Sequence, residues 1–309
     1  MNVADVQHLE NLRGELRLNE PMATHVSWRA GGAAARTYAP ADLDDLAVFL
    51  RMVPVTEGLY FCGLGSNLLI RDGGVRATVV FTHWALRQIA LLNTGEHAIE
   101  IHAGAGIAAP KAARFAAMHG AEGAEFLAGI PGTLGGALAM NAGCYGGETW
   151  ELVASVTTID RAGDLHHRGR DEFQIGYRSV QGPAEEWFVA AMLQVPRGDG
   201  ANASEKSRNK IKDLLSKRIA SQPLQQPNAG SVFRNPVGDH AARLIEACGL
   251  KGRRIGGAEI SMKHANFIVN VGGASAADIE ALIELAQQTV REKFSVELEC
   301  EVRIIGERA

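Results

Sequence analysis

Hydrophobic positions along this 309-residue chain follow two spacings, short apolar runs and longer segments of helical period. The short runs, rich in β-branched and aromatic residues, predict strands. The longer amphipathic segments predict helices, opened by capping residues such as Ser275. The strands are expected at residues 34–40, 58–63, 75–82, 97–105, 152–160, 164–169, 185–195, 265–271 and 296–306, and the helices at 41–53, 109–120, 204–221, 239–249 and 275–294. This mixture predicts an α+β protein, with residues 196–207 as a linker.

Two glycine-rich segments interrupt the pattern, "GLGSNLLIRDGG" at residues 63–74 and "GIPGTLGGALAMNAG" at residues 129–143. Both are predicted as loops. Glycine lets the backbone adopt positive φ and approach a ligand closely, and successive free N–H groups form an anion-binding concavity. Side-chain donors are expected from Ser66, Asn67, Thr133 and Asn141. The pair of loops favours a phosphate or pyrophosphate ligand over tight turns without one.

Two common phosphate-binding motifs do not fit these loops. Leu68 stands where the dinucleotide-binding pattern G-x-G-x-x-G needs its last glycine. No glycine run is followed by the Gly-Lys-Ser/Thr of a P-loop. The ligand therefore requires a different fold.

Composition and charge narrow the class of protein further. With 46% hydrophobic and 21% charged residues, the chain can build a large core in two or three domains. A net charge of -4 gives no general attraction to nucleic acid. No apolar run is long enough to insert into a membrane, and the first residues lack the apolar core of a signal peptide. Four cysteines without a C-x-x-C pair argue against a metal site and favour the reducing cytoplasm.

Several segments together resemble one enzyme family, the UDP-N-acetylenolpyruvoylglucosamine reductases, in the same order from about residue 24 to the C-terminus. They are "GLGSNLLIRDGG", "LAGIPGTLGGALAMNAGCYGGE", "GYRS", "NAGSVFRNP", "HANFIVN" and "LECEVRIIG". The resemblance implies an FAD-binding fold of the vanillyl-alcohol-oxidase/p-cresol-methylhydroxylase type, made of two subdomains, plus a C-terminal α/β substrate-binding domain. The short stretch between Arg178 and Ser231 is similar to the second class of the family, which lacks a tyrosine-bearing loop.

The resemblance also implies domain boundaries and ligands. Residues 1–78 and 79–200 would be the two FAD-binding subdomains, residues 201–298 the UDP-sugar domain, and residues 299–309 a strand returning to the active site. The cofactor would be non-covalent FAD, reduced by NADPH. The substrate would be UDP-N-acetylglucosamine enolpyruvate, converted to UDP-N-acetylmuramate for peptidoglycan synthesis. The implied FAD-binding residues are Gly63, Leu64, Gly65, Ser66, Asn67, Leu68, Ile130, Pro131, Gly132, Thr133, Gly135, Gly136, Asn141 and Gly143.

Three residues take catalytic roles by the same resemblance. Hydride from flavin N5 would add to the terminal methylene carbon of the enolpyruvyl ether and leave carbanion character on the adjacent carbon. Arg178 would hold the substrate carboxylate with its planar fork. Ser231 would donate the proton to the carbanion, and Glu301 would position or polarise the enolpyruvyl group. Without the resemblance, these residues would be interpreted as a strand-end arginine, a turn serine and a solvated strand face.

Four further residues are implied substrate contacts, namely Tyr177, Arg234, Asn235 and His264. Arg234 stands where lysine is commoner in the family. His264 has a second interpretation, as a capping or core histidine. Arg29 has two as well, a flavin contact or an anchor of the N-terminal strand. Cys300 is interpreted as a small buried residue rather than a nucleophile.

Two other functions remain open from the residues. One is a flavoprotein of the same fold, such as an oxidase of small alcohols, which would not need Ser231 or Glu301. The other is a non-catalytic nucleotide-sugar binding protein, which would keep the glycine loops and be colourless.

Overall fold

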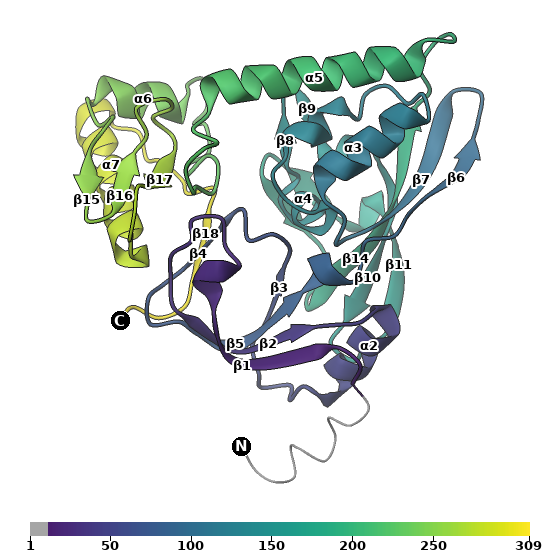
Figure 1. The fold of residues 1–309 in the computed structure, drawn as a ribbon, viewed down its shortest axis with the longest axis horizontal. Coiled ribbons are helices and arrows are strands. Elements are labelled where there is room, and N and C mark those ends of the chain that lie inside the picture. Colours follow the sequence, from purple (N-terminus) through teal and green to yellow (C-terminus); the bar gives the residue numbers. More distant parts are fainter. Residues whose placement is uncertain (1–11) are drawn as a thin grey trace. The chain divides into compact units, whose positions relative to one another are not determined.

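A computed structural model describes residues 12–309 of the chain (Figure 1). The prediction that the N-terminus lacks a signal-peptide core falls largely on residues 1–11, outside the described residues. The helices are α2 (Leu43–Met52), α3 (Ala109–Met118), α4 (Leu134–Met140), α5 (Ala203–Ser221), α6 (Ala241–Ala247) and α7 (Ala276–Phe294). The strands are β1 (Glu15–Pro21), β2 (Ala33–Ala39), β3 (Leu59–Cys62), β4 (Leu68–Ile70), β5 (Val75–Phe81), β6 (Ile89–Thr94), β7 (Ala98–Gly104), β8 (Gly143–Cys144), β9 (Gly147–Glu148), β10 (Val153–Asp160), β11 (Leu165–Gly169), β12 (Gln174–Gly176), β13 (Ser179–Gln181), β14 (Glu186–Pro196), β15 (Arg254–Ile255), β16 (Ala258–Ile260), β17 (Ile268–Asn270) and β18 (Arg303–Ile305).

The chain forms two compact units, each assembled from segments distant in sequence. Unit 1 contains the described residues up to Arg17, then Arg36–Gly63 and Ala77–Leu215. Unit 2 contains Leu18–Ala35, Leu64–Arg76 and Ser216–Ala309. The sequence predicted contiguous domains instead. The two divisions differ because the boundary falls inside β1, β2, β5 and α5, so the chain passes from one unit to the other within single elements.

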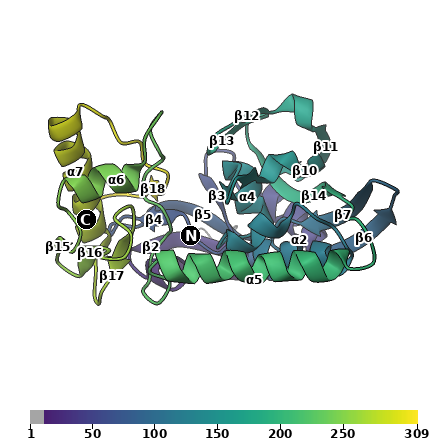
Figure 2. The ribbon, with the colours of Figure 1, turned by 90° about the horizontal axis from the view of Figure 1, so that it is seen from above.

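Unit 1 is organised around an antiparallel five-stranded sheet of order β11-β10-β14-β7-β6. Helices α3 and α4 pack against β7 (Figure 1). The short hairpin β12–β13 lies beside α4 (Figure 2). Apolar residues of the strands and of both helices form one continuous core, with Trp150 fully buried in it.

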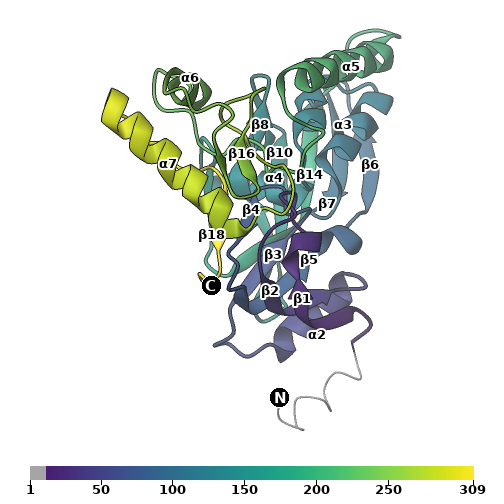
Figure 3. The same ribbon diagram turned by 60° about the vertical axis from the view of Figure 1, so that its left-hand side comes forward.

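Unit 2 contains the long helix α7, which packs against the strands β15 and β16 (Figure 3). These strands and β17 form a three-stranded antiparallel sheet. The C-terminal strand β18 pairs in parallel with β4. Trp28 is fully buried in the core of this unit and donates from its indole nitrogen to the Ile268 carbonyl at 2.7 Å.

Ser275 caps α7 as the sequence predicted, and Asp42 caps α2. The Asp42 side chain accepts from the Asp45 N–H at the start of α2, and Ser275 forms a reciprocal capping box with Asp278 at the start of α7. Within residues 12–309, no helix combines the length and the apolar character needed to cross a bilayer.

Strands β1, β6, β8, β9, β12, β13, β15 and β16 were not predicted, and three predicted segments take another form. Residues 129–143 are not a continuous loop, because α4 occupies Leu134–Met140 and is held by packing on the sheet despite its glycines. The segment after Gly65 contains the strand β4, which needs β18 as its partner. The predicted C-terminal strand over residues 296–306 is regular only at Arg303–Ile305. Tertiary pairing decides all three, and pairing is not visible in local spacing.

Candidate active site

The two glycine-rich segments meet in unit 1. A Cβ added to Gly63 would lie 2.2 Å from the Oγ1 atom of Thr133, so these residues pack without space for another side chain. Gly63 directly follows β3, and Thr133 directly precedes α4. The structure therefore brings together two segments that are some seventy residues apart in sequence.

Three backbone N–H groups of the second glycine segment donate hydrogen bonds within the protein. The N–H groups of Leu134 and Gly135 donate to the carbonyls of Ile107 and Ala105, both at 2.8 Å. The Gly136 N–H donates to Thr133 Oγ1 at 3.4 Å, as an N-cap. These three N–H groups at the start of α4 are therefore hydrogen-bonded within the protein and do not form the expected anion-binding concavity.

The glycines of this segment serve close packing more than unusual backbone angles. The positive φ lies at a non-glycine residue, Asn141, with φ 40°. A Cβ on Gly135 would approach the Ala105 Cβ to 2.9 Å, so glycine is required there by the protein's own packing. A Cβ on Gly136 would meet only Thr133 Oγ1, at an ordinary 3.7 Å, and Gly136 is exposed. The sequence suggested two uses of glycine in this loop, positive φ and close approach of other atoms. Positive φ is not found at these glycines, and close approach of protein atoms is found at Gly135.

The first glycine segment does use positive φ. Gly65 has φ 58°, and a Cβ there would lie 2.3 Å from the His25 carbonyl oxygen. Asn67 in the same segment is bound to the C-terminal segment in two ways. Its side chain donates to the Glu301 carbonyl at 3.0 Å, and its own carbonyl accepts from the Arg303 N–H at 3.0 Å. The side chain expected to face a ligand thus holds the backbone of Glu301.

Arg178 occupies the second position of the two-residue turn that joins β12 to β13. Its φ of 53° is left-handed, which costs about 1–3 kcal/mol for a residue with a side chain. Its guanidinium donates to the carbonyls of Asn141, at 3.3 Å, and Gly143, at 2.6 Å. The guanidinium also lies over the Tyr177 ring, 4.9 Å from the centroid. The predicted catalytic arginine is therefore bound to the end of the second glycine segment.

Asn141 is buried and makes three side-chain hydrogen bonds within unit 1. Its amide nitrogen donates to Glu148 Oε2 at 2.7 Å and to the Gly176 carbonyl at 3.1 Å. Its amide oxygen accepts from the Trp150 N–H at 3.1 Å. Because both amide hydrogens are engaged, the expected donation from this side chain to a ligand does not fit the geometry.

Ser231 and Glu301 lie on neighbouring extended segments in unit 2. Phe233 and Cys300 form an antiparallel bridge between these segments. The Glu301 N–H donates to the Val232 carbonyl at 2.8 Å, and the Val232 N–H donates to the Asn266 carbonyl at 2.9 Å. Both predicted catalytic side chains are half-buried. Burial alternates along this segment, since Leu298 and Val302 are buried while Glu297 and Glu299 are exposed.

The other predicted substrate residues have protein partners of their own. Arg234 pairs with Glu299 at 3.4 Å. The Asn235 amide oxygen accepts from the Ala241 N–H at 3.2 Å, at the start of α6. Tyr177 is exposed beside Arg178, and Arg29 is exposed in a left-handed turn with φ 55°.

His264 adopts the capping arrangement that the sequence left open. Its Nδ1 accepts from the Asn266 N–H at 3.3 Å. Its ring packs edge-on against the Phe267 ring, with 4.7 Å between the ring centroids. Burial, with the nearby charge of Lys251, lowers the pKa of the imidazole. Cys300 is half-buried rather than buried, and burial raises the pKa of its thiol, which favours the protonated form.

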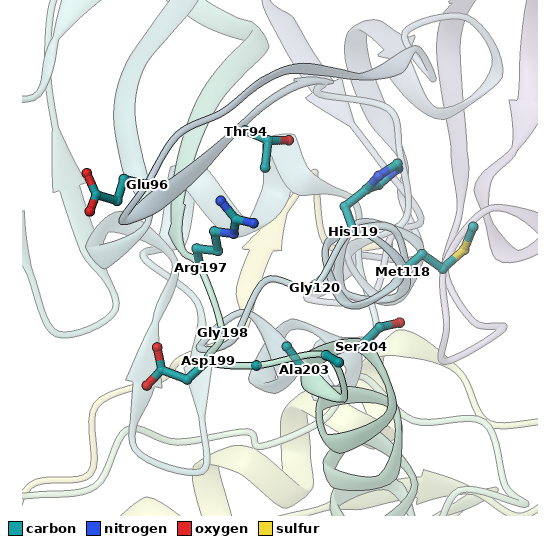
Figure 4. A pocket seen from close by; sticks show the side chains of 12 residues that line it. Thr94, Glu96, Met118, His119, Gly120, Arg197, Gly198, Asp199, Ala203 and Ser204 are labelled. Atoms are coloured by element: carbon teal, nitrogen blue, oxygen red, sulfur yellow. The ribbon is translucent and has the colours of Figure 1, made fainter.

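Unit 1 also contains an open pocket, drawn in Figure 4. It is lined by Met118 and His119 at the end of α3, by Arg197, and by Ser204 at the start of α5. The Arg197 guanidinium donates to the Gly95 carbonyl at 3.0 Å. None of the predicted site residues lines this pocket, so we assign it no part in the reaction.

Each unit thus assembles part of the predicted site. Unit 1 joins the second glycine segment, Gly63 and Arg178, and unit 2 joins the first glycine segment, Ser231 and Glu301. Sequence reasoning assigned no role to Glu148, although it ends one of the motifs that carried the resemblance. Its position seven residues after Asn141, across a Tyr-Gly-Gly turn, was the available signal.

Comparison with known proteins gives the same family at several levels. Residues 222–305 match the model described as "UDP-N-acetylenolpyruvoylglucosamine reductase, C-terminal domain", and residues 34–169 match "FAD binding domain". The UDP-N-acetylenolpyruvoylglucosamine reductase of Thiobacillus denitrificans is 56% identical over 309 residues, covering 96% of this chain and 94% of the relative. The enzyme of that name from Legionella pneumophila strain Corby is 53% identical, covering 98% and 96%.

Solved structures confirm the predicted fold. The reductase of the same name from Thermus caldophilus superposes with a TM-score of 0.76 at 30% identity, covering 95% of this chain and 99% of that one. The 6-hydroxy-D-nicotine oxidase of Arthrobacter nicotinovorans shares the fold alone, with a TM-score of 0.52, 11% identity and coverage of 93% and 88%. The FAD-binding fold of the vanillyl-alcohol-oxidase type and the added C-terminal domain are therefore as the sequence predicted. The chain belongs to the UDP-N-acetylenolpyruvoylglucosamine reductase family of FAD-dependent oxidoreductases, which act in the synthesis of peptidoglycan precursors.

Proposed function

We propose that this chain reduces UDP-N-acetylglucosamine enolpyruvate to UDP-N-acetylmuramate with NADPH as the hydride donor, and that Ser231 supplies the proton. The observation that supports this proposal most directly is the main-chain pairing around Ser231 and Glu301. That pairing places a hydroxyl and a carboxylate on adjacent, well-fixed segments. Membership in the reductase family favours this function over an oxidase or a non-catalytic binding protein. A cytoplasmic location stays a prediction from the sequence.

The glycine segments fit an FAD cofactor. Neither backbone angle nor protein packing requires glycine at the exposed Gly136, so the absent side chain leaves space for a ligand. We propose that Gly136, with Gly132 and Thr133, holds the cofactor pyrophosphate, and that Leu64 to Leu68 are further cofactor contacts. The remaining predicted contacts, Ile130, Pro131, Gly135, Asn141 and Gly143, would act through their backbone and through packing. When bound, FAD would take a hydride from NADPH and supply it to the enolpyruvyl methylene carbon.

Arg178 would hold the substrate carboxylate during this addition. The carbon next to the carboxylate gains electron density when the methylene carbon gains hydride, and the carboxylate shares that charge. A guanidinium already fixed by two carbonyls stabilises the developing charge with little reorganisation. We propose Tyr177, Arg234, Asn235 and His264 as further substrate contacts.

Ser231 would then protonate the electron-rich carbon. A hydroxyl is a weak acid, but a carbanion is a strong base, so the proton transfer is downhill. One hydride from NADPH and one proton from Ser231 together saturate the double bond. Solvent then restores the serine proton, so hydrogen atoms and electrons balance. Glu301 would orient the enolpyruvyl group beside the hydroxyl.

The test separates the two half-reactions by stopped-flow absorbance of bound flavin. In Ser231→Ala, flavin reduction by NADPH should stay near the wild-type rate, because it needs no proton on a substrate carbon. Reoxidation by the enolpyruvyl sugar nucleotide should slow by roughly 10²–10⁴-fold, as for loss of a general acid. The matched control is Ser275→Ala, which removes the N-cap of α7 and should lose only about 1 kcal/mol of stability. Equal slowing of both phases in Ser231→Ala, or of neither, would return Ser231 to an ordinary turn role.

A further inference from the structure

The strained turn at Arg178 is held by the pairing of β12 with β13 and by hydrogen bonds to Asn141 and Gly143. Arg178 has a left-handed backbone, with φ 53°, in a two-residue hairpin turn. A residue with a side chain keeps such a conformation only where the surrounding structure fixes it. Asn141 makes two of these hydrogen bonds, one with the Gly176 carbonyl and one with the Arg178 guanidinium.

The two bonds come from different parts of Asn141. Its side-chain nitrogen donates to the Gly176 carbonyl, two residues before Arg178, at 3.1 Å. Its main-chain carbonyl accepts from the Arg178 guanidinium at 3.3 Å. Asn141 therefore fixes both the backbone that carries the arginine and the end of the arginine side chain.

Asn141 is itself fixed by its surroundings. It ends α4 in the left-handed conformation, with φ 40° and ψ 51°, which asparagine tolerates better than most residues. Glu148 accepts from its amide nitrogen at 2.7 Å, and the Trp150 N–H donates to its amide oxygen at 3.1 Å. These partners set the orientation of the amide, so that its nitrogen faces the Gly176 carbonyl. Asn141 is 1% exposed, and the bonds are therefore shielded from competing water.

We propose that Asn141, oriented by Glu148, is a positioning residue that holds the Arg178 guanidinium in its productive place. The inference rests on the proposed role of Arg178 in the reductase reaction. A displacement of about 1 Å at a catalytic group can cost about 10²-fold in rate without any loss of the group itself. Asn141 acts through Arg178 and does not donate from its side chain to substrate or cofactor.

The decisive variant is Asn141→Gly, because glycine keeps the left-handed backbone and removes only the side chain. Flavin content and flavin reduction by NADPH should stay close to wild type. Reoxidation by the enolpyruvyl sugar nucleotide should slow by about 10²-fold. Asn19→Gly is the matched control, since Asn19 is an exposed asparagine with φ 53° in β1, and both of its half-reactions should be unchanged.

A double-mutant cycle with Arg178→Lys distinguishes positioning from general loosening of the fold. If Asn141 acts through Arg178, the double variant should reoxidise no more slowly than Arg178→Lys alone. Multiplied effects would overturn the inference, and so would a wild-type reoxidation rate in Asn141→Gly. If Asn141→Gly does not fold, Glu148→Ala replaces it, with an expected slowing of about 10-fold and the same lack of additivity. Glu148→Gln keeps an acceptor for the amide and should restore most of that rate.

The same cycle separates failure of the inference from failure of the proposed function. A wild-type rate in Arg178→Lys would remove Arg178 from catalysis and the proposed function with it. A slow Arg178→Lys with an unaffected Asn141→Gly would leave the proposed function standing and remove only the positioning role.

Discussion

At the residue scale, two asparagines of the glycine segments donate from their side chains to backbone carbonyls at or near predicted catalytic residues. Asn67 binds the Glu301 carbonyl, and Asn141 binds the Gly176 carbonyl beside Arg178. Each lies in a motif that sequence reasoning assigned to phosphate binding. Under the proposed function, such a motif would have two roles, since its glycines would leave room for the cofactor and its asparagines would fix the proposed catalytic groups.

Gly136 gives a residue-scale prediction. Gly136→Val should lower flavin occupancy, because the new side chain would occupy the space we assign to the cofactor, while the apo-protein keeps nearly wild-type stability. Absorbance at the flavin band per mole of protein measures the first effect, and thermal unfolding of the apo-protein measures the second. Gly135→Val is the contrast, since its Cβ would press on Ala105 at 2.9 Å and should destabilise the apo-protein itself. Full flavin occupancy in Gly136→Val would argue against the assignment.

At the element scale, helix α5 is held in place by a few buried residues. Only Ala203, Ser207 and Ile211 of its nineteen residues are buried, at a spacing of one helical turn. Ser207 and Lys210 donate to the buried carboxylate of Glu125, at 2.8 and 3.1 Å. Burial by itself would raise the pKa of this carboxyl, but hydrogen bonds from Ser207, from its own backbone, from Lys210 and from Gly123 lower it. One buried carboxylate therefore anchors the first half of the helix.

The element-scale prediction concerns this anchor. Glu125→Gln keeps the side-chain shape but replaces a carboxylate that accepts three hydrogen bonds with a neutral amide. The change should lower the free energy of unfolding by about 1–3 kcal/mol. Urea denaturation followed by circular dichroism measures the loss. Glu205→Gln, at an exposed position of the same helix, is the control and should change stability by less than about 0.5 kcal/mol. Equal stability of the two variants would mean that α5 is held by its apolar contacts alone.

At the scale of the whole molecule, each unit is built from distant segments of chain. The first glycine segment is separated by more than two hundred residues from the C-terminal segment that it binds. Contacts of such long sequence separation have to form before either half of the site is complete. Stability of the whole fold is therefore a condition for the site, and its dependence on pH matters for activity.

The unfolding free energy should fall as the pH drops below about 6.5, partly because of His264. Burial keeps the folded imidazole neutral by lowering its pKa, so the unfolded chain binds a proton more readily. At pH values above the pKa of the unfolded imidazole, His264 makes its full contribution to stability. As the pH falls below that value, proton binding to the unfolded chain reduces the contribution. His264→Asn keeps an acceptor for the Asn266 N–H without titrating in this range. Its thermal unfolding between pH 7.5 and about 5 should vary less than wild type, and parallel curves would contradict the assignment.

The sequence by itself determined the fold class, the family and most helices of this protein. Capping residues such as Asp42 and Ser275 and the helical spacing behind them act locally, so they could be recognised without any partner. The alternation of buried and exposed residues near the C-terminus was visible for the same reason, because it depends only on a two-residue period.

Only the tertiary structure decided what the glycine segments do. Helix α4 forms in a glycine-rich stretch because the sheet buries its apolar face, and β4 is a strand because β18 lies beside it. The bonds of Asn67 and Asn141 join residues up to 234 positions apart, and a local pattern holds no information about such partners. The sequence could therefore predict candidate residues for the site. Which of them contact a ligand and which hold their neighbours in place depended on hydrogen-bond geometry that exists only after the chain has folded.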